Sequence, residues 1–304
     1  MNILIAGGMG FVGRSLTQYL VEKEHHVTVL TRNVERWRKT PTHPLVSYDS
    51  WVMDQWKRTL KDHRVIINLA GTSIFRFWNH SGKTAIYNSR ILTTRDLVDT
   101  LTGFASSEIT FINFSGIGYY GFGGDEVLDE NHPSGHDFLA RVARDWESEA
   151  LRAANSGFRV VLCRLGHVLG YHGGVLKKLY ALSKYNLGGY WGDGRQWFSW
   201  IHEADIAQVI FFLLEENNIS GPVNLSTPLP VRNRDLMEIL NRLTENRPLL
   251  PRIPAWLLRT CMGELSSLFL TGQRVMPALL EKQGFIFQHP SLENALKCLL
   301  KCKP

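Results

Sequence analysis

The chain opens MNILIAGGMGFVGRSL, a short apolar strand that runs directly into a glycine-rich turn and a helix. Three glycines spaced three apart form this turn: Gly7, Gly10 and Gly13. The first lets the chain turn sharply, the second lets backbone N–H groups approach a phosphate, and the third lets helix and strand pack closely. A helix N-terminus adds free N–H donors and the positive end of its dipole. The opening therefore predicts a dinucleotide-binding turn that includes Phe11 and Val12.

Short runs rich in Val, Ile and Leu alternate with amphipathic stretches through the first 165 residues. The runs are NILIA (2–6), HVTVL (26–30), RVIINLA (64–70), ITFINFS (109–115) and RVVLCRL (159–165). Helical patterns lie between them, at 11–23, about 53–62, about 80–102 and 137–155. Nearly continuous apolarity is typical of strands covered on both faces, and a repeated β-then-α order is typical of parallel crossover units. The sequence predicts an α/β fold with a doubly wound parallel sheet of the Rossmann type.

The alternation loosens after Gly166, where glycine-rich loops lead to WIHEADIAQVIFFLLEE, a helix with Asp205 in its first turn. A short strand is predicted at 221–226 and a helix at 233–244, and the prolines of 247–256 look like a boundary. We therefore expect three parts: a cofactor-binding domain over 1–165, a mixed region over 166–246 that completes the sheet and forms a substrate lobe, and a small, mainly helical domain over 247–304.

Composition restricts the class of protein. The 304 residues carry 34 Lys and Arg against 28 Asp and Glu, a net charge of +6, and four cysteines are too few for a disulfide scaffold. Cys298 and Cys302 are spaced for one helix face but have neither a histidine nor a second cysteine pair nearby in sequence, so we predict no metal site there. No stretch approaches the ~18 apolar residues of a membrane helix, and the start lacks a basic leader. We expect a cytoplasmic protein with a small-molecule substrate and without a membrane partner; the oligomeric state stays open, a homodimer included.

The end of the second predicted strand indicates which cofactor would bind. A site for NAD usually places Asp or Glu there, whereas this chain reads VTVLTRN, with Arg32 nineteen residues after Gly13. A guanidinium suits the 2′-phosphate of NADP(H), which it can hold with two hydrogen bonds. The alternative is that Arg32 faces solvent at a helix start. The basic stretch 32–39 is typical of a solvated helix face, so we expect no nucleic-acid partner.

Six motifs follow one another along the chain in an order and spacing typical of a known family. They are GGMGFVG, the TR after the second strand, NLAG (68–71), SGIGYYG (115–121), RLGHVLG (164–170) and WIHEADIA (200–207). Together they resemble the extended and atypical short-chain dehydrogenase/reductases of the NAD-dependent epimerase/dehydratase type. The chain is most similar to the YfcH-like subgroup of "epimerase family proteins", also called short-chain dehydrogenase family 39U. Residues 263–296 are similar to that subgroup's C-terminal domain of unknown function, so the resemblance covers nearly the whole chain.

The resemblance implies a set of cofactor-binding residues. Thr31 and Arg32 would face the 2′-phosphate, Arg90 would lie near the cofactor, and Val168 would lie beside the nicotinamide. Leu69, Ala70 and Gly71 would line the adenine and ribose. From the residues alone, small side chains at a strand's carboxyl end open the crevice where such sheets bind ligands. Read without the family, Arg90 could equally form a surface ion pair with Asp96.

The superfamily's usual catalytic residues are a Ser or Thr after the fifth strand and a Tyr-x-x-x-Lys on the next helix. Ser115 fits the first position, but the helix has no tyrosine or lysine; Phe138 and Val142, or Leu139 and Ala143, stand there instead. Tyr120 is our candidate proton donor, with packing as the alternative. Weaker candidates are Tyr119, Asp137, Arg141 and His202, with Arg195 and Lys83 for an anionic group and Trp78, Trp191, Trp197 and Trp200 bordering the cleft.

These observations lead to two functional hypotheses. The first is an NADP(H)-dependent oxidoreductase or epimerase that acts on a small carbonyl compound or a sugar-like metabolite, with Ser115 polarising the carbonyl. The second is a non-catalytic sensor or interaction protein that uses NADP(H) only as a ligand. The missing tyrosine and lysine favour the second hypothesis, and the polar and aromatic loops 72–80 and 186–200 favour a substrate site.

Overall fold

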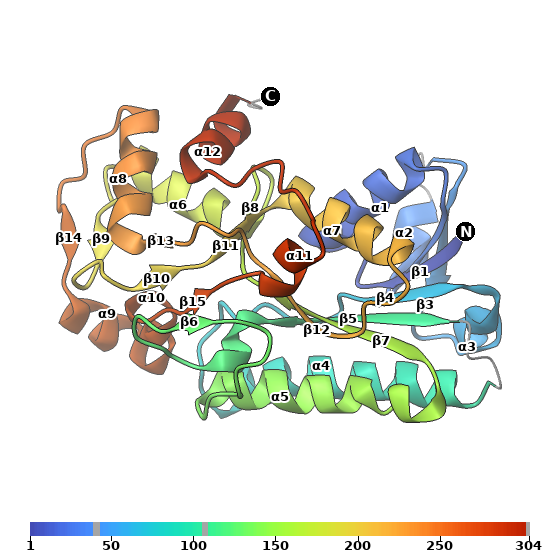
Figure 1. The fold of residues 1–304 in the computed structure, drawn as a ribbon. Coiled ribbons are helices and arrows are strands. Elements are labelled where there is room, and N and C mark those ends of the chain that lie inside the picture. The colour runs from blue at the N-terminus through green and yellow to red at the C-terminus, as the bar shows by residue number, and fades with distance from the viewer. Residues whose placement is uncertain (39–42, 105–108, 302–304) are drawn as a thin grey trace.

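The computed structural model describes residues 1–38, 43–104 and 109–301, and its centre is a parallel sheet (Figure 1). Seven strands lie in the order β12-β7-β5-β4-β1-β2-β3. Their bounds are β1 Asn2–Ala6, β2 His26–Thr31, β3 Val46–Ser50, β4 Val65–Asn68, β5 Thr110–Gly116, β7 Arg159–Leu165 and β12 Gly221–Leu225. Every neighbouring pair in the sheet is parallel. This confirms the predicted doubly wound α/β fold.

Helices cover both faces of the sheet (Figure 1). On one face lie α1 (Phe11–Glu22) and α7 (Glu203–Glu215); on the other lie α4 (His80–Thr102) and α5 (Phe138–Leu151). Two short helices, α2 (Val34–Arg38) and α3 (Gln55–Thr59), lie against β3, and the 3₁₀ turns Leu60–Asp62 and Ala154–Ser156 follow α3 and α5.

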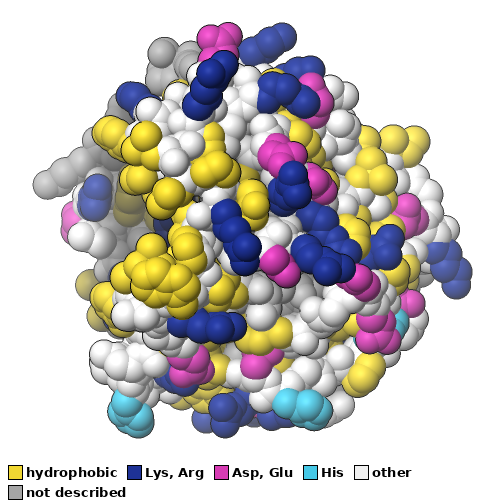
Figure 2. Space-filling model, turned by 90° about the vertical axis from the view of Figure 1, so that its left-hand side faces the viewer, with side chains coloured by type: hydrophobic (Ala, Val, Ile, Leu, Met, Phe, Trp, Pro, Cys, Tyr) yellow, Lys and Arg dark blue, Asp and Glu magenta, His cyan; other side chains and the backbone are white. Residues whose placement is uncertain are grey.

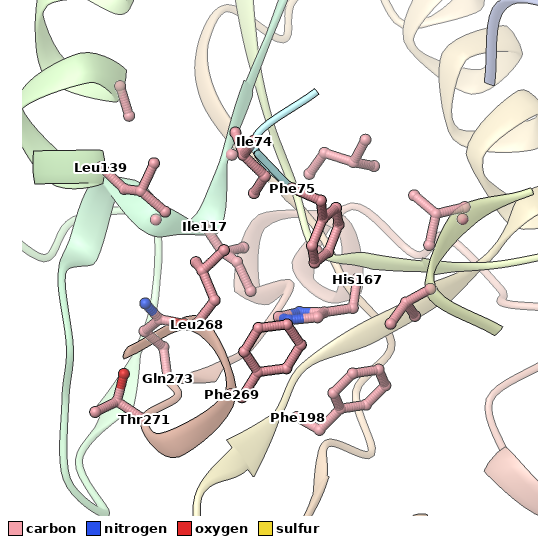
Figure 3. A pocket seen from close by; sticks show the side chains of 18 of the residues that line it. Ile74, Phe75, Ile117, Leu139, His167, Phe198, Leu268, Phe269, Thr271 and Gln273 are labelled. Atoms are coloured by element: carbon pink, nitrogen blue, oxygen red, sulfur yellow. The ribbon is translucent and has the colours of Figure 1, made fainter. Parts of the chain in front are cut away.

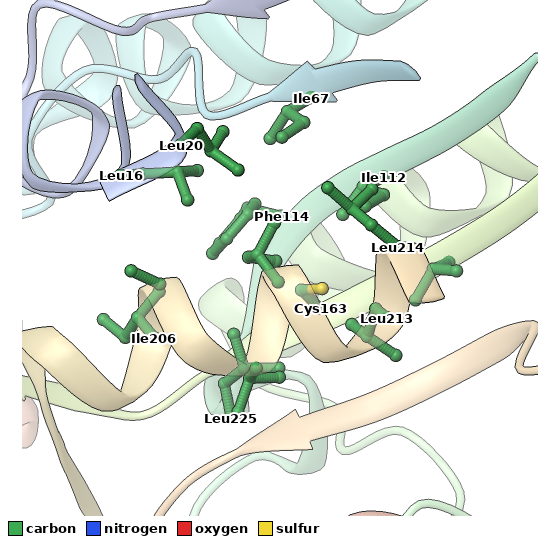
Figure 4. Packing of buried hydrophobic residues seen from close by; sticks show 14 of the residues in the cluster. Leu16, Leu20, Ile67, Ile112, Phe114, Cys163, Ile206, Leu213, Leu214 and Leu225 are labelled. Atoms are coloured by element: carbon green, nitrogen blue, oxygen red, sulfur yellow. The ribbon is translucent and has the colours of Figure 1, made fainter. Parts of the chain in front are cut away.

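Successive side chains of the central strands enter different cores, because a strand alternates its side chains between two faces. Phe114 of β5 packs with Leu16 of α1 and Ile206 of α7 (Figure 4). Phe111 of the same strand packs with Leu97 of α4 in a second core. Burial on both faces explains why these strands read as continuous apolar runs.

Strand β3 is the strand of the central sheet that the sequence did not predict. Its residues VSYDS are polar and only partly buried, because β3 is an edge strand of the sheet. An edge strand can pair its backbone on one side without an apolar sequence, so it carries little of the signal that identified the central strands. The short strand predicted at 221–226 forms the opposite edge as β12.

A second lobe is built from short strand pairs and helices. Its strands are β8 His167–Leu169, β9 Tyr190–Trp191, β10 Trp197–Phe198, β11 Trp200–His202, β13 Val231–Arg232 and β14 Arg252–Ile253. Its helices are α6 Gly174–Lys184, α8 Asn233–Thr244 and α12 Leu292–Lys301. These elements share an apolar core of their own around Trp200, Leu240 and Leu296.

The remaining C-terminal elements pack back onto both parts. They are α9 Ala255–Met262, a 3₁₀ turn Gly263–Ser266, α10 Ser267–Leu270, β15 Arg274–Val275 and α11 Ala278–Lys282. Strand β15 pairs with β6 (Val127–Leu128), and α11 lies against β12.

The outer surface of the second lobe is mixed in character. Figure 2 views the end of the molecule that carries α8, α9 and β14, where hydrophobic side chains lie between charged ones. None of the helices in the described part of the chain combines the length and the apolar composition needed to span a bilayer.

Candidate functional site

The glycine turn between β1 and α1 has the geometry that its sequence predicts. Gly7 has φ of +79°, and a Cβ there would lie 2.8 Å from the carbonyl carbon of Leu69. A Cβ on Gly13 would lie 2.5 Å from the Cα of Gly8. The turn and the helix can therefore pack this closely only if residue 13 is glycine. Gly10 caps α1 without a side-chain hydrogen bond, which leaves the N–H groups of the first helical turn available for an anion.

Strand register brings the other predicted cofactor residues to the same edge. Ala6 of β1 lies opposite Leu30 of β2 and Asn68 of β4, so the residues that follow each strand flank the turn. These residues are Thr31 and Arg32 on one side and Leu69, Ala70 and Gly71 on the other. The Arg32 side chain is exposed and has no ion pair with any described residue. The structure thus places a guanidinium, and no carboxylate, directly after β2.

Arg90 of α4 lies in the wall of the crevice beyond this edge. Its Nη1 donates to the carbonyl oxygens of Thr72 at 3.0 Å and Ile86 at 3.1 Å, and its guanidinium carbon lies 5.1 Å from the Trp146 ring centroid. Burial lowers the pKa of Arg90 to about 10, so it stays charged at neutral pH. The alternative ion pair with Asp96 is not formed; Asp96 pairs with Lys57.

A cavity of about 540 Å³ lies beside Phe11, the first residue of α1, while Gly7, Gly10 and Gly13 are not among its lining residues (Figure 3). Its walls come from Phe11, from the end of β5 with Ser115, from α5, from α6, from β8 with Val168 and from residues 268–273 of the C-terminal segment. Most lining side chains are apolar or aromatic, as in ordinary small-molecule sites.

The glycines after β8 make room for Phe11. A Cβ at Gly170 would lie 2.2 Å from the Phe11 ring, and one at Gly173 would lie 2.4 Å from it. The glycine-rich stretch after β8 therefore fixes the position of Phe11 between the glycine turn and the cavity. This explains two glycines that the sequence alone left without a role.

Ser115 is tied to a buried ion pair behind the cavity wall. Its hydroxyl donates to Glu147 Oε1 at 2.6 Å. Arg164 donates to the same carboxylate from Nε at 2.9 Å and from Nη2 at 2.8 Å, and the side chains of Arg164 and Glu147 are only 4% and 5% exposed. In this arrangement the Ser115 proton points to Glu147, so the oxygen of Ser115 offers the cavity lone pairs rather than a proton.

Tyr120 lies behind the same wall. Its hydroxyl donates to Asn224 Oδ1 at 2.7 Å and accepts from Arg164 Nη1 at 3.0 Å. Burial raises its pKa to about 12, and Tyr120 is not among the residues that line the cavity. The structure therefore does not bring Tyr120 to the cavity, and its hydroxyl is already engaged, so a role as proton donor to a substrate stays a prediction that this geometry does not favour.

Comparison with protein families agrees with the fold. The model of the NAD dependent epimerase/dehydratase family matches residues 3–225. The chain belongs to this family. A second model, the domain of unknown function DUF1731, matches residues 253–299.

Individual relatives cover nearly the whole chain. An "epimerase family protein SDR39U1 homolog, chloroplastic" from Arabidopsis thaliana is 33% identical over 99% of this chain and 87% of its own length. The crystal structure of human epimerase family protein SDR39U1 (isoform 2), solved with NADPH, matches with a TM-score of 0.88 at 28% identity over 100% of both chains. MoeE5, solved with UDP-glucuronic acid and NAD, has a TM-score of 0.79 at 17% identity over 99% of this chain and 98% of its own; it shows the shared fold alone.

This member of the epimerase/dehydratase family has an apolar wall where the resemblance implies a tyrosine and a lysine. Leu139, Val142 and Ala143 of α5 all line the cavity. None of these side chains can donate or accept a proton, so α5 supplies shape and no acid–base group there. Phe138 instead packs edge-on against Trp78, with ring centroids 5.3 Å apart.

Most of the weaker candidates have structural partners. Asp137 caps α5 through Ala140 N, His202 caps α7 through Ala204 N, and Lys83 pairs with Glu264 at 2.6 Å. Trp191 and Trp197 line the cavity. The other candidates are outside its lining: Tyr119, Arg141, Arg195, Trp78 and Trp200.

Among the polar residues of the cavity wall that were not singled out from the sequence are His167 and Lys178. His167 Nδ1 lies 3.2 Å from the carbonyl oxygen of Ser199, and its ring lies 4.5 Å from that of Phe198 (Figure 3). Because a carbonyl only accepts, Nδ1 carries the proton and Nε2 keeps a lone pair. Burial lowers the pKa of His167 to about 4, so it is neutral. Lys178 of α6 also lines the cavity. The lone histidine in RLGHVLG was the available signal for His167; Lys178 had none.

One group of side chains could be considered for a metal. Ligand-type atoms of His202, His289 and Cys298 lie within 4.8 Å of one another; Cys302, which the sequence also singled out, lies outside the described residues. The imidazoles of His202 and His289 are stacked, with centroids 3.8 Å apart. His202 Nδ1 accepts from Ala204 N, which puts its proton on Nε2, the other ring nitrogen. Stacked rings and a protonated nitrogen are unsuited to coordination, so we interpret this group as packing.

Proposed function

We propose that this chain is an NADP(H)-dependent oxidoreductase or epimerase that acts on a small carbonyl compound or a sugar-like metabolite. The observation that carries this proposal is a cavity of about 540 Å³ that is lined by Phe11, the first residue of α1, and has Ser115 in its wall. Support for NADP(H) over NAD comes from Arg32 at the end of β2, from the absence of an acidic residue in the β2 sequence, and from the human relative solved with NADPH.

The residues at the sheet edge fit this cofactor. The turn from Gly7 to Gly13 would hold the pyrophosphate, Thr31 and Arg32 the 2′-phosphate, and Leu69, Ala70 and Gly71 the adenine side. Phe11 and Val168 would lie at the nicotinamide end, where both line the cavity. When bound, the nicotinamide supplies or accepts a hydride.

The residues of the chain itself would orient the substrate. Rotation about the Cβ–Oγ bond of Ser115 turns its proton from Glu147 to a substrate carbonyl, which it then polarises. We propose that water supplies the proton, because the Tyr120 hydroxyl is engaged by Asn224 and Arg164 behind the wall. His167 Nε2 can accept a hydrogen bond from a substrate hydroxyl or from that water.

A second function is favoured by a specific observation. The cavity positions on α5 are Leu139, Val142, Ala143 and Trp146, so no acid–base pair stands on this helix where the superfamily usually has one. A protein that only senses NADP(H) would need the turn, Arg32 and the cavity shape, and would need no proton donor. The two functions differ in whether bound NADPH is consumed.

Anaerobic stopped-flow absorbance with the NADPH-loaded chain tests the proposal. We expect at least one aldehyde, ketone or keto-sugar of a broad panel to oxidise NADPH, and we expect Ser115→Ala to abolish this oxidation while NADPH still binds. Ser47→Ala on β3, at the far edge of the sheet, is the matched control and should react as the wild type. Tight NADPH binding without turnover across the panel would favour the sensor and contradict the enzyme.

A further inference from the structure

Lys178 of α6 lines the cavity, and its exposed side chain forms no ion pair with any described residue. Its Nζ lies 3.6 Å from the centroid of the Phe75 ring, and partial burial lowers its pKa. No ion pair joins it to any residue in the described ranges 1–38, 43–104 and 109–301. Lys83, which does not line the cavity, differs in this respect, because it pairs with Glu264 at 2.6 Å.

The charged side chains described in the wall of the cavity are all positive. Of the described residues that line it, none is Asp or Glu, and the only Lys and Arg are Lys178 and Arg90. The Arg90 guanidinium is held in place, because its Nη1 donates hydrogen bonds to the carbonyl oxygens of Thr72 and Ile86. The ammonium of Lys178 is therefore the cation of this wall that can turn to a ligand, and a ligand anion would meet no like charge.

The rest of the wall indicates the body of such a ligand. Phe75, Phe198, Phe269 and Trp191 line the same cavity, and Figure 3 shows the phenylalanine rings gathered around the His167 side of it. Aromatic walls bind apolar or planar groups by area and by ring packing. A cavity of about 540 Å³ that must also admit the nicotinamide end leaves room for a small molecule only.

We infer that Lys178 binds the carboxylate of a small substrate whose apolar or aromatic body packs against Phe75, Phe198 and Phe269. This rests on the proposed function and names its substrate class. A carboxylate fits better than a diphosphate, because one unpaired ammonium matches one negative charge, whereas diphosphates are held by several charged or backbone donors. A phosphate of the cofactor is the other anion within reach of this cavity, so the experiment must separate the two sources.

Binding measured on the full chain saturated with NADP⁺ tests this without any turnover. The probes are benzoate, phenylacetate and 3-phenylpropionate, each compared with its neutral amide by calorimetry or ligand-observed NMR. We expect at least one acid to bind at least tenfold more tightly than its amide, Lys178→Met to remove that preference, and Lys178→Arg to retain most of it. Lys177→Met is the matched control, because Lys177 is exposed on the same helix and does not line the cavity.

Three results would overturn the inference. The first is that no acid binds better than its amide. The second is that Lys178→Met leaves the preference intact while its melting temperature matches the wild type. The third is that Lys178→Met weakens NADPH binding tenfold or more, which would assign the lysine to a cofactor phosphate. Because none of these readouts needs catalysis, the inference can fail while the oxidoreductase stands, and it can hold for a sensor that has no turnover.

Discussion

Replacing Glu147 by Gln would leave the buried guanidinium of Arg164 without a counter-charge. The two side chains are 5% and 4% exposed and share two hydrogen bonds of 2.9 and 2.8 Å, so solvent cannot take over the lost partner. Removing one partner of such a pair costs about 3–5 kcal/mol. For a chain of this size each kcal/mol is worth about 2 °C, so we expect Glu147→Gln to lower the melting temperature by about 6–10 °C.

Two comparisons separate burial from charge as the cause. Lys83→Met breaks the pair with Glu264, whose side chains are 31% and 53% exposed, and should cost less than about 1 kcal/mol. The double variant Glu147→Leu/Arg164→Met removes both buried charges and should recover most of the loss. Circular dichroism melting of the four proteins without cofactor is the assay. The reasoning is refuted if Glu147→Gln melts within about 2 °C of the wild type, or if Lys83→Met loses as much.

Arg32→Ala should weaken NADPH binding about 10- to 100-fold, because a charge-assisted hydrogen bond contributes about 1.5–3 kcal/mol, and it should leave NADH binding nearly unchanged. Fluorescence titration with both cofactors measures this effect, and equal losses of affinity for the two would contradict the role of Arg32. Gly13→Ala should lower both the melting temperature and the NADPH affinity, because its Cβ would lie 2.5 Å from the Cα of Gly8. Gly124→Ala is the control: no atom lies within 4 Å of its Cβ, so it should leave both the melting temperature and the NADPH affinity unchanged. Burial, with a smaller contribution from His289, lowers the pKa of His202 from 6.5 to about 3, so the unfolded chain takes up this proton first and stability is lost as the pH falls below 6.5. His202→Asn keeps a capping side chain and should reduce that loss by up to about 1.4 kcal/mol per pH unit in urea unfolding between pH 6.5 and 4; an unchanged slope would show that His202 does not hold the neutral form.

Elements with strong local patterns were predictable from the sequence. The glycine turn, the buried strands and the helix at 233–244 follow from spacing and apolar periodicity, and α8 spans Asn233–Thr244 as expected. The link between Ser115 and Glu147 was not predicted, because it joins residues 32 positions apart through tertiary packing. One signal pointed to it: Arg164 stands within the apolar run RVVLCRL, and a charge in a buried strand requires a partner.

Residues 268–273 show a second limit of local patterns. Leu268, Phe269, Thr271 and Gln273 line the cavity although they belong to the C-terminal segment, more than 150 positions after Ser115. Their sequence is unremarkable for a lobe of short helices. Only the folded chain shows that these residues line the same cavity as the end of β5.

The C-terminal segment completes the cavity, and its attachments show how it is held there. Ser199 Oγ donates to the Gln273 carbonyl at 2.7 Å and accepts from Val275 N at 2.9 Å, while Gln196 Nε2 donates to the Phe269 carbonyl at 2.6 Å. These contacts bind the segment to residues 196–199 between β9 and β11, where β10 contributes Trp197 and Phe198 to the wall. Backbone carbonyls and a buried hydroxyl hold the segment without adding charge, so residues 268–273 bring no ionised group to a wall whose described cations are Lys178 and Arg90. On the inference drawn above, this segment would contribute shape to the choice of ligand and α6 would contribute the Lys178 cation, and both lie outside the glycine turn.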